Sequence, residues 1–374
     1  MFRRASVVLA AAGAVLGLAM APAGAAGGWV AGGWVAVPDP DSSRWFDAFL
    51  TADDGTVIGR GGFSPGEGDG EVASFWVREG SAWKLLPKSE ATPYTDTFGS
   101  GVWSATSAKD FWVVGGISAK PAIVSHWNGS AWQDRSPADQ TVHFDDVEAV
   151  SAGDVWAVGT TQWKTTTPTQ AAVIGHWEGG SWKITKLPQA VGGRTRLFDV
   201  QVNSAADVWA SGESCTDQES RNCRGYVVRW NGASWTEVPV PAGITRVSAM
   251  TADAAGQVWV AHKNTVLRWN GSGWSTGADV VGVGSDGVNE FAWADGKLYA
   301  GLDLSSSSRH SGIVRWNGTS WESLARPIDN PDYSINQITS LAGRTDGELW
   351  AAGSYNLLWS NPPFAARLPA GAAG

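Results

Sequence analysis

The sequence predicts an all-β protein made of one unit that is repeated along the chain. Three observations carry this prediction. The composition is rich in tryptophan and glycine, with 24 Trp against 5 Tyr and 47 Gly in 374 residues. Two tryptophans separated by four residues recur, mostly around Asn-Gly, and an Asp-x-Trp element recurs upstream of such pairs. Short aromatic strands joined by tight turns are the structures that this composition favours.

The paired tryptophans indicate β-hairpins. Asn-Gly between two apolar runs is a strong hairpin signal because both residues tolerate positive φ, so we expect two-residue type I′ turns centred on Asn-Gly. In that register the second Trp lies one diagonal step from the first on the same sheet face. The copies span residues 127–132, 177–182, 230–235, 269–274 and 316–321.

The Asp-x-Trp element marks the strand that precedes each hairpin. Asp110, Asp154 and Asp207 each stand two residues before a Trp, and further copies are degenerate. One unit is therefore a meander of four strands, and its anchors at positions 58, 112, 156, 209, 259, 299 and 350 count seven units. Four strands at this period are typical of propeller blades, and radial closure hides the open edges. We predict a seven-bladed β-propeller of four-stranded antiparallel blades in residues 27–362.

Ring closure requires one more strand in the last blade, whose inner strands we place within residues 335–361. Residues 27–38 resemble the fourth strand of a unit, since the 12-residue step from Trp34 to Phe46 equals that from Trp132 to Phe144. We expect this N-terminal segment to be the outer strand that closes the ring. Residues 363–374 are either a C-terminal tail or, through Phe364–Pro369, a rival closing strand.

The N-terminus has the pattern of a secretory signal peptide. Arg3 and Arg4 precede a short apolar run, and small residues suited to cleavage follow, so residues 1–26 are expected to be removed. We expect a secreted, extracellular protein with no membrane span. The net charge of −9 becomes −11 when the two arginines leave, and an acidic chain argues against nucleic-acid binding. Export also predicts a disulfide between Cys215 and Cys223.

Two segments carry a resemblance. The units Ser151–Gly159 and His176–Trp182 resemble those of secreted actinobacterial β-propellers, and the match covers nearly all of the mature chain. Some propellers of this kind look like the lectin subunits of umbrella toxin particles. The resemblance rests on the repeat and not on a diagnostic site motif. It implies binding to glycans or cell surfaces and assembly with other secreted proteins.

Candidate ligand-binding residues come from two features. One residue near the start of an inner strand is polar in five units, and such a ring has the chemistry to bind sugar hydroxyls or Ca²⁺. The alternative is that these residues cap turns or hold water. Trp163 lies off the repeat register in a polar loop and is a further candidate. The ring residues are Asp47, Asp146, Asp199, Asn289 and Gln337.

The sequence offers no convincing catalytic set. Five Tyr are too few to nominate a sialidase-type nucleophile, and the five His are scattered. We therefore expect a non-enzymatic binding module with no required cofactor. It would recognise a glycan or a secreted protein through its face loops, as a lectin subunit of an extracellular antibacterial toxin complex if the resemblance holds. The alternative is an extracellular hydrolase or lyase that acts in the propeller channel.

Overall fold

The structure is a computed structural model that describes residues 32–40, 44–63, 74–87, 102–115, 121–161, 170–188, 193–217, 222–277, 279–280, 287–304, 311–327, 334–356 and 363–372. Every regular element in this part of the chain is a β-strand. No helix there is long and apolar enough to cross a membrane. The expected signal peptide and Trp163 lie outside the described residues.

Five sheets have four strands each, and each is an antiparallel meander in chain order. Their strands are β2 (Arg44–Thr51), β3 (Val57–Phe63), β4 (Ser74–Glu79) and β5 (Ala82–Leu85); β6 (Val102–Ser107), β7 (Asp110–Gly115), β8 (Ile123–Trp127) and β9 (Trp132–Asp134); β10 (Val142–Ser151), β11 (Asp154–Thr161), β12 (Ala172–Glu178) and β13 (Ser181–Lys186); β14 (Arg194–Ser204), β15 (Asp207–Cys215), β16 (Cys223–Trp230) and β17 (Trp235–Glu237); β18 (Ala249–Ala252), β19 (Val258–His262), β20 (Thr265–Trp269) and β21 (Trp274–Thr276).

One sheet has eight strands, and it consists of two meanders. A single residue pair, Asp303 with Gln337, joins the two halves. The first half contains β22 (Gly287–Ala294), β23 (Lys297–Asp303), β24 (Ile313–Trp316) and β25 (Trp321–Ser323). The second contains β26 (Ser334–Gly343), β27 (Leu349–Asn356), β28 (Pro363–Leu368) and β1 (Val35–Ala36).

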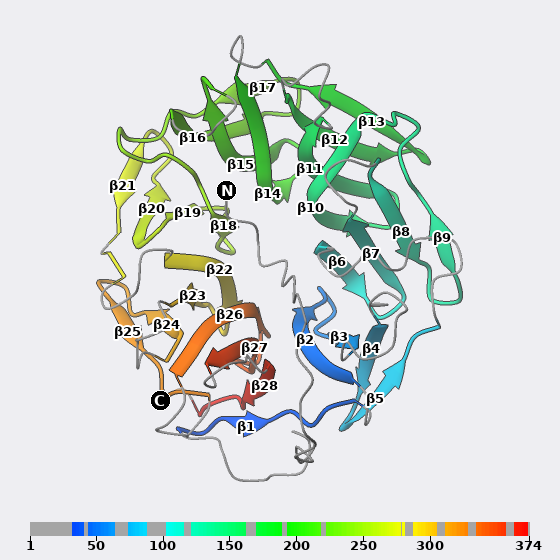
Figure 1. Cartoon of the computed structure of the whole chain (residues 1–374), viewed down its shortest axis with the longest axis vertical. Helices are drawn as coiled ribbons and strands as arrows, with labels where there is room; N and C mark the ends of the chain where they lie inside the picture. The colour runs from blue at the N-terminus through cyan, green and yellow to red at the C-terminus, as the bar shows by residue number, and fades with distance from the viewer. Residues whose placement is uncertain are drawn as a thin grey trace, which may run out of the picture.

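The meanders are arranged radially, with the first strand of each one innermost (Figure 1). The inner strands neighbour one another in the closed order β2, β6, β10, β14, β18, β22, β26 and back to β2. This ring of antiparallel sheets is the architecture of a β-propeller. The prediction of an all-β fold built from repeated four-stranded units is therefore confirmed.

Both chain ends contribute to the sheet that closes the ring. β28 pairs with β27, and β1 pairs with β28 as the outermost strand, with Val35 opposite Arg367. The N-terminal segment is thus the outer strand, as expected. The C-terminal segment that was considered as a rival closing strand is β28, the third strand of the same sheet. The expectation that residues 335–361 hold all three inner strands is therefore wrong.

The hairpin turns lie one residue further along the chain than predicted. Trp127 is the direct cross-strand partner of Trp132, so the central turn residues are Gly129 and Ser130. Only the glycine has positive φ, at 88°. Asn128 precedes the turn. Its Oδ1 accepts hydrogen bonds from the backbone N–H groups of Ser130 and Ala131. Asparagine therefore acts through its side chain and not through a left-handed backbone.

The repeat tryptophans pack one sheet on the next. Trp112, Trp156 and Trp209 are buried, and each ring meets the hairpin tryptophans of the following sheet at centroid distances between 5.6 and 6.4 Å. Such contacts add to the roughly 1.5–3 kcal/mol gained by burying a large apolar side chain. The interpretation of these residues as packing plates is confirmed.

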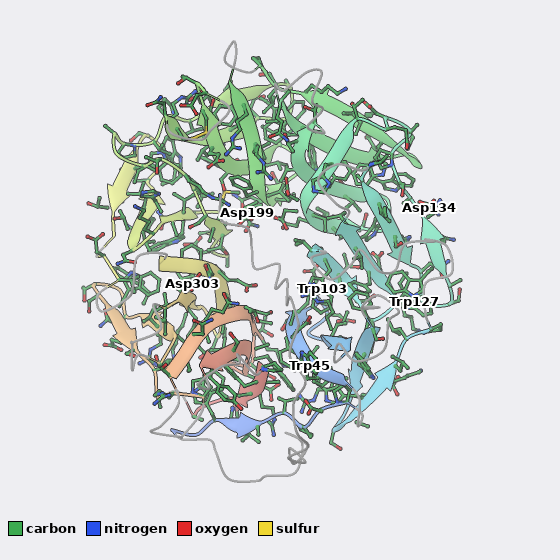
Figure 2. The ribbon with its side chains drawn as sticks, in the orientation of Figure 1. Trp45, Trp103, Trp127, Asp134, Asp199 and Asp303 are labelled. Carbon is green, nitrogen blue, oxygen red and sulfur yellow. A yellow bond between two sulfur atoms is a disulfide. The ribbon has the colours of Figure 1, made fainter. Side chains whose placement is uncertain are left out.

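Polar side chains on the inner strands bond the sheets to one another. The Asp146 carboxylate accepts the backbone N–H of Val200 in the next sheet at 2.9 Å, and the Asp199 carboxylate accepts that of Met250 at 2.9 Å. Figure 2 shows Asp199 on the inner side of the ring. The same bond recurs at equivalent positions, from Leu341 N–H to Glu290 and from Phe49 N–H to Ser340.

A second level of these bonds lies two residues further along the strands. Ser104, Glu148 and Gln201 accept the N–H groups of Ala149, Val202 and Ala252 respectively, at 2.7–3.1 Å. Burial raises the pKa of Glu148 well above its usual value, and the charges of Asp146, Asp199 and Asp53 raise it further, against the lowering effect of the Val202 N–H. We call the two levels together the cross-sheet bonds.

Replacing a cross-sheet acceptor should measure its contribution to the ring. We expect Asp199→Ala to lower the free energy of unfolding by about 1–3 kcal/mol, because it leaves a buried N–H without an acceptor. Asp199→Asn retains an acceptor oxygen and should cost less. Urea denaturation of both variants tests this, and equal losses in the two variants would contradict the role assigned to the bond.

Candidate functional site

The long connections of the chain leave from one face of the ring. β11 ends at Thr161 and β12 begins at Ala172, whereas only two residues join β10 to β11 at the other face. By the same antiparallel topology, the N-terminal ends of the inner strands reach the face with the long connections. We call it the loop face and the opposite one the turn face. Recognition is concentrated on variable loops held by a rigid scaffold, which makes the loop face the natural place for a site.

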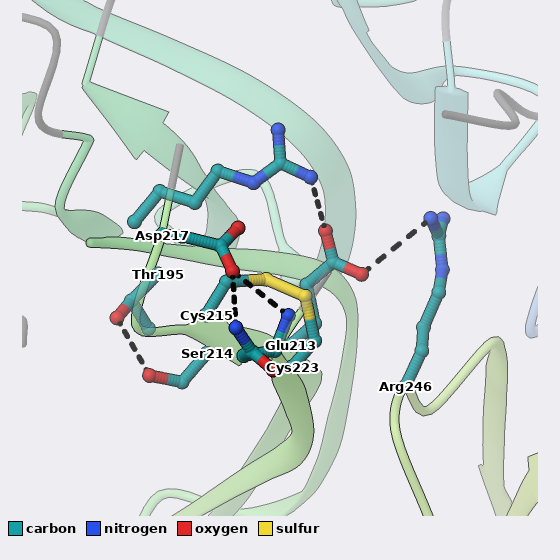
Figure 3. The surroundings of a disulfide bond; sticks show 9 residues. Thr195, Glu213, Ser214, Cys215, Asp217, Cys223 and Arg246 are labelled. Atoms are coloured by element: carbon teal, nitrogen blue, oxygen red, sulfur yellow. Dashed lines mark hydrogen bonds and ion pairs between the residues drawn. A yellow bond between two sulfur atoms is a disulfide. The ribbon is translucent and has the colours of Figure 1, made fainter. Parts of the chain in front are cut away.

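A group of charged residues lies at the loop face over β10, β14, β15 and the segment before β18. Its centre is Glu213, which is buried. Glu213 Oε1 lies 3.0 Å from Arg194 Nη2, and Oε2 lies 3.9 Å from Arg246 Nη1, so a guanidinium group stands on each side of it (Figure 3). Arg194 is itself only 7% exposed. A buried carboxylate requires such cationic partners.

Two of the arginines are held against an aromatic ring. The guanidinium carbons of Arg196 and Arg246 lie 5.2 and 3.9 Å from the centroid of the Phe198 ring. These are cation–π distances, and they limit the rotamers open to both side chains. Arg196 Nη2 also lies 3.9 Å from Asp145 Oδ1, and His143 Nε2 lies 3.6 Å from the same oxygen. The arginine cluster is the set His143, Asp145, Arg194, Arg196, Phe198, Glu213 and Arg246.

The arginine cluster is not saturated with hydrogen bonds. Four of its atoms are buried and lack a partner: His143 Nδ1, Asp145 Oδ2, Arg194 Nε and Arg196 Nε. Leaving a buried polar atom unpaired costs about 1–3 kcal/mol, so such atoms call for an explanation when several occur together. Parts of the Arg196, Asp145 and Arg246 side chains are nevertheless exposed, so a polar ligand can contact the cluster there.

The predicted disulfide is present beside the cluster. Cys215 and Cys223 are bonded and face each other across β15 and β16 (Figure 3). Within the described ranges, Glu213 and these two cysteines are the only group of three metal-type ligands with atoms close together. Both thiols are consumed by the disulfide, so this group does not form a metal site in the oxidised chain.

The five predicted ring residues do not share one level. Asp146 and Asp199 are equivalent and buried, and both serve in cross-sheet bonds. Asp47 and Asn289 are the extra residues of β-bulges and stand one position before the level of Asp146 and Asp199. Asp47 also pairs with Arg60 at 2.9 Å. Gln337 stands earlier still, at the level of His143. The residues equivalent to Asp47 and Asn289 are the bulge residues Asp145 and Phe198, so the sequence alignment was wrong by one position. Ca²⁺ or sugar binding by this ring stays a prediction.

The tryptophans outside the repeat have different environments. Trp76 is buried in the core, and Trp293 donates from Nε1 to Thr251 Oγ1 at 3.0 Å. Trp103 is half-buried and packs on Phe75 and Phe111. Ligand contact by Trp163 stays a prediction.

A recurrent set of acid, tryptophan and cation lies at the turn face and was not predicted from the sequence. In β7 and β8, His126 Nε2 bonds Asp110 Oδ1 at 2.7 Å, Trp112 Nε1 donates to the same oxygen at 3.2 Å, and the two rings stack at 4.2 Å. His or Arg directly before each hairpin tryptophan was the available signal. The equivalent sets are Asp154, Trp156 and His176; Asp207, Trp209 and Arg229; Glu348, Trp350 and Arg367.

Comparison with known proteins supports the fold alone. No protein-family model and no curated protein sequence matches the chain. Among solved structures, virginiamycin B lyase from Staphylococcus aureus is similar at 12% identity and a TM-score of 0.57, over 90% of this chain and 98% of that one. The extracellular domain of the putative hybrid two-component system BT3049 from B. thetaiotaomicron is similar at 10% identity and a TM-score of 0.53. The match covers 87% of this chain and 40% of that one. YCF48 bound to D1 peptide matches at 13% identity and a TM-score of 0.49, over 90% of this chain and 94% of that one.

These structures overturn one expectation. We expected a non-enzymatic protein, yet a lyase shares this architecture over nearly its whole length. The expectation is therefore corrected, because the fold does not separate a binding protein from an enzyme.

The acid–tryptophan–histidine set makes stability depend on pH. Burial by itself raises the pKa of Asp110, but hydrogen bonds from His126, Thr106 and Trp112 outweigh it and hold the pKa below its usual value. A carboxylate with a lowered folded pKa stabilises the fold above its unfolded pKa of about 4, and the benefit is lost as the pH falls. The stability gap between wild type and Asp110→Asn should shrink from pH 5 to pH 3 in urea titrations. A constant gap would contradict the assignment.

The disulfide should stabilise the fold by an amount that rises with the logarithm of the length of the loop that it closes. For a sequence separation of eight residues, the loss of chain entropy predicts about 2.5 kcal/mol. We expect the Cys215→Ser, Cys223→Ser double variant to lose about this much in thermal or urea unfolding. Loss of less than about 0.5 kcal/mol would mean that the turn holds its geometry without the bond.

Proposed function

We propose that this protein is a secreted binding protein that recognises its ligand at the loop face, through the arginine cluster. The observation that carries this proposal is a set of buried charged groups with unpaired polar atoms, placed where the long connections leave the ring. Other polar groups of the inner strands, such as the Asp146 and Asp199 carboxylates, join one sheet to the next. The ligand is a glycan or a protein partner.

The proposal includes the architecture that presents the site. We propose seven blades, taking β22–β25 as one blade and β26–β28 with β1 as another. The single pair that joins these halves supports the division, since the strands within each half pair along their lengths. The mature protein would begin after residue 26, export would explain the disulfide, and the propeller would span residues 27–372.

The biological setting is a further part of the proposal. The repeat resembles that of secreted actinobacterial propellers, and this supports a role as the lectin subunit of an extracellular toxin particle. A lectin needs a rigid scaffold with a polar site on one face. The loop face supplies the site, and the turn face, with its hydrogen-bonded pairs of acid and cation, supplies rigidity.

A glycan array with the purified protein tests the proposal, alongside co-purification of secreted proteins from the producing strain. We expect binding of at least one glycan class or one secreted partner, weakened at least about tenfold by Arg246→Gln, because a charged hydrogen bond is worth about 1.5–3 kcal/mol. Lys109→Ala serves as the control, since it removes an exposed cation from the turn face. No glycan and no partner, or equal effects of both variants, would contradict the proposal.

A further inference from the structure

We propose that the arginine cluster binds the acidic sugar residue of a glycan. The sugar carboxylate would lie on the guanidinium groups of Arg196 and Arg246, and a neighbouring hydroxyl would donate to Asp145. The inference rests on the proposed function and names the ligand class for that site. The side chains of Arg196, Arg246 and Asp145 are 24%, 31% and 21% exposed, respectively, so part of each is accessible from the loop face.

The charge of the cluster fits a single negative charge. Arg194, Arg196 and Arg246 supply three positive charges, and Asp145 and Glu213 supply two negative ones, which leaves one positive charge. The whole chain carries −9, so this local excess is opposite in sign to the rest of the molecule. A carboxylate neutralises it. A phosphate carries up to two charges and would also meet the Asp145 and Glu213 carboxylates, which disfavours it.

The spacing of Arg196 and Asp145 favours a ligand rich in hydroxyl groups. Arg196 Nε is a donor without an acceptor, and Asp145 Oδ2 is an acceptor without a donor. These two side chains approach to 3.9 Å, which is too long for a hydrogen bond between them. One hydroxyl placed between Arg196 Nη2 and Asp145 Oδ1 can accept from the guanidinium and donate to the carboxylate, whereas a peptide N–H only donates and a peptide carbonyl only accepts. A sugar therefore matches this arrangement better than an acidic peptide.

The site is organised before a ligand arrives. Phe198 holds two of the guanidinium groups by their faces, and Glu213 holds Arg194 at 3.0 Å. The disulfide ties β16 to β15 two residues beyond Glu213. Side chains that are already fixed lose little entropy on binding, so the gain from a charge-assisted contact is retained as affinity.

Three other arginines of the described residues are each paired with a carboxylate. Arg229 bonds Asp207 at 2.6 Å, Arg344 bonds Asp346 at 2.9 Å and Arg367 bonds Glu348 at 2.9 Å. Each of these guanidinium groups already faces a carboxylate at hydrogen-bond distance. The Arg196 guanidinium, in contrast, has its nearest carboxylate oxygen at 3.9 Å and a buried Nε without a partner.

The test is calorimetric titration of the full chain with tetrasaccharides of galacturonic, glucuronic and mannuronic acid. The matched neutral probes are the same tetrasaccharides with their carboxylates reduced to alcohols. We expect at least one acidic tetrasaccharide to bind at least about tenfold more tightly than its neutral form, and Arg196→Ala and Arg246→Gln each to remove about tenfold. Binding should weaken with added salt.

Asp145→Ala separates sugar recognition from simple attraction of an anion. If a hydroxyl donates to Asp145, this variant should lower the affinity for the acidic tetrasaccharide about fivefold or more. If the site merely attracts negative charge, removal of the carboxylate should raise the affinity, which would overturn the inference. Lys109→Ala should change nothing. Thermal unfolding of each variant shows whether the fold is retained, and Arg246→Gln is the variant to rely on if Arg196→Ala unfolds.

The remaining outcomes are also decisive. Binding of neutral glycans without preference for the acidic forms would overturn this inference and leave the proposed function standing. Binding of acidic peptides in place of every tetrasaccharide would do the same. Absence of any glycan or protein ligand would remove both proposals.

Discussion

The structure depends on how the innermost strand of each sheet satisfies its backbone. This strand has a neighbour in its own sheet on one side only, so part of its N–H groups have no strand to bond. The cross-sheet bonds supply acceptors from side chains of the preceding sheet, as Asp146 does for Val200 and Asp199 for Met250. Each bond also fixes the position of one sheet against the next. The ring thus closes on side-chain chemistry as well as on tryptophan packing.

This constraint explains which parts of the fold were predictable. The repeated Asp-x-Trp elements and tryptophan pairs predicted where the strands lie, in which order they follow one another and which side chains pack between sheets. Large apolar side chains have to be buried, so their spacing indicates these features. Register was harder to predict. The type I′ expectation put Asn128 inside the turn, whereas the side-chain acceptor of Asn128 moved the turn to Gly129 and Ser130. A local hydrogen bond outweighed the backbone preference on which the prediction rested.

The same difficulty affected the candidate site. The bulge residues Asp47 and Asn289 are equivalent to Asp145 and Phe198 and not to Asp146 and Asp199, so the residues aligned by sequence stand at different levels. Asp146 and Asp199 were selected correctly as polar positions but serve in bonding between sheets. The arginine cluster could not be recognised in the sequence because its members come from separate strands. Only the run Arg194–Phe198, with two arginines and a phenylalanine at alternate positions, gave a local signal.

The two faces of the ring use the same residue types in different ways, and this difference is the strongest argument for where function lies. At the turn face, acid and cation meet at hydrogen-bond distance beside a tryptophan, for example Asp154 with His176 at 2.8 Å, and the acid of each set accepts a hydrogen bond from its cation. At the loop face, the cation Arg196 and the acid Asp145 stand 3.9 Å apart, and both keep a buried atom without a partner. Charged groups used only for stability have no reason to remain unsaturated, because the unpaired atoms cost free energy. Their retention beside the long connections is what a binding site requires.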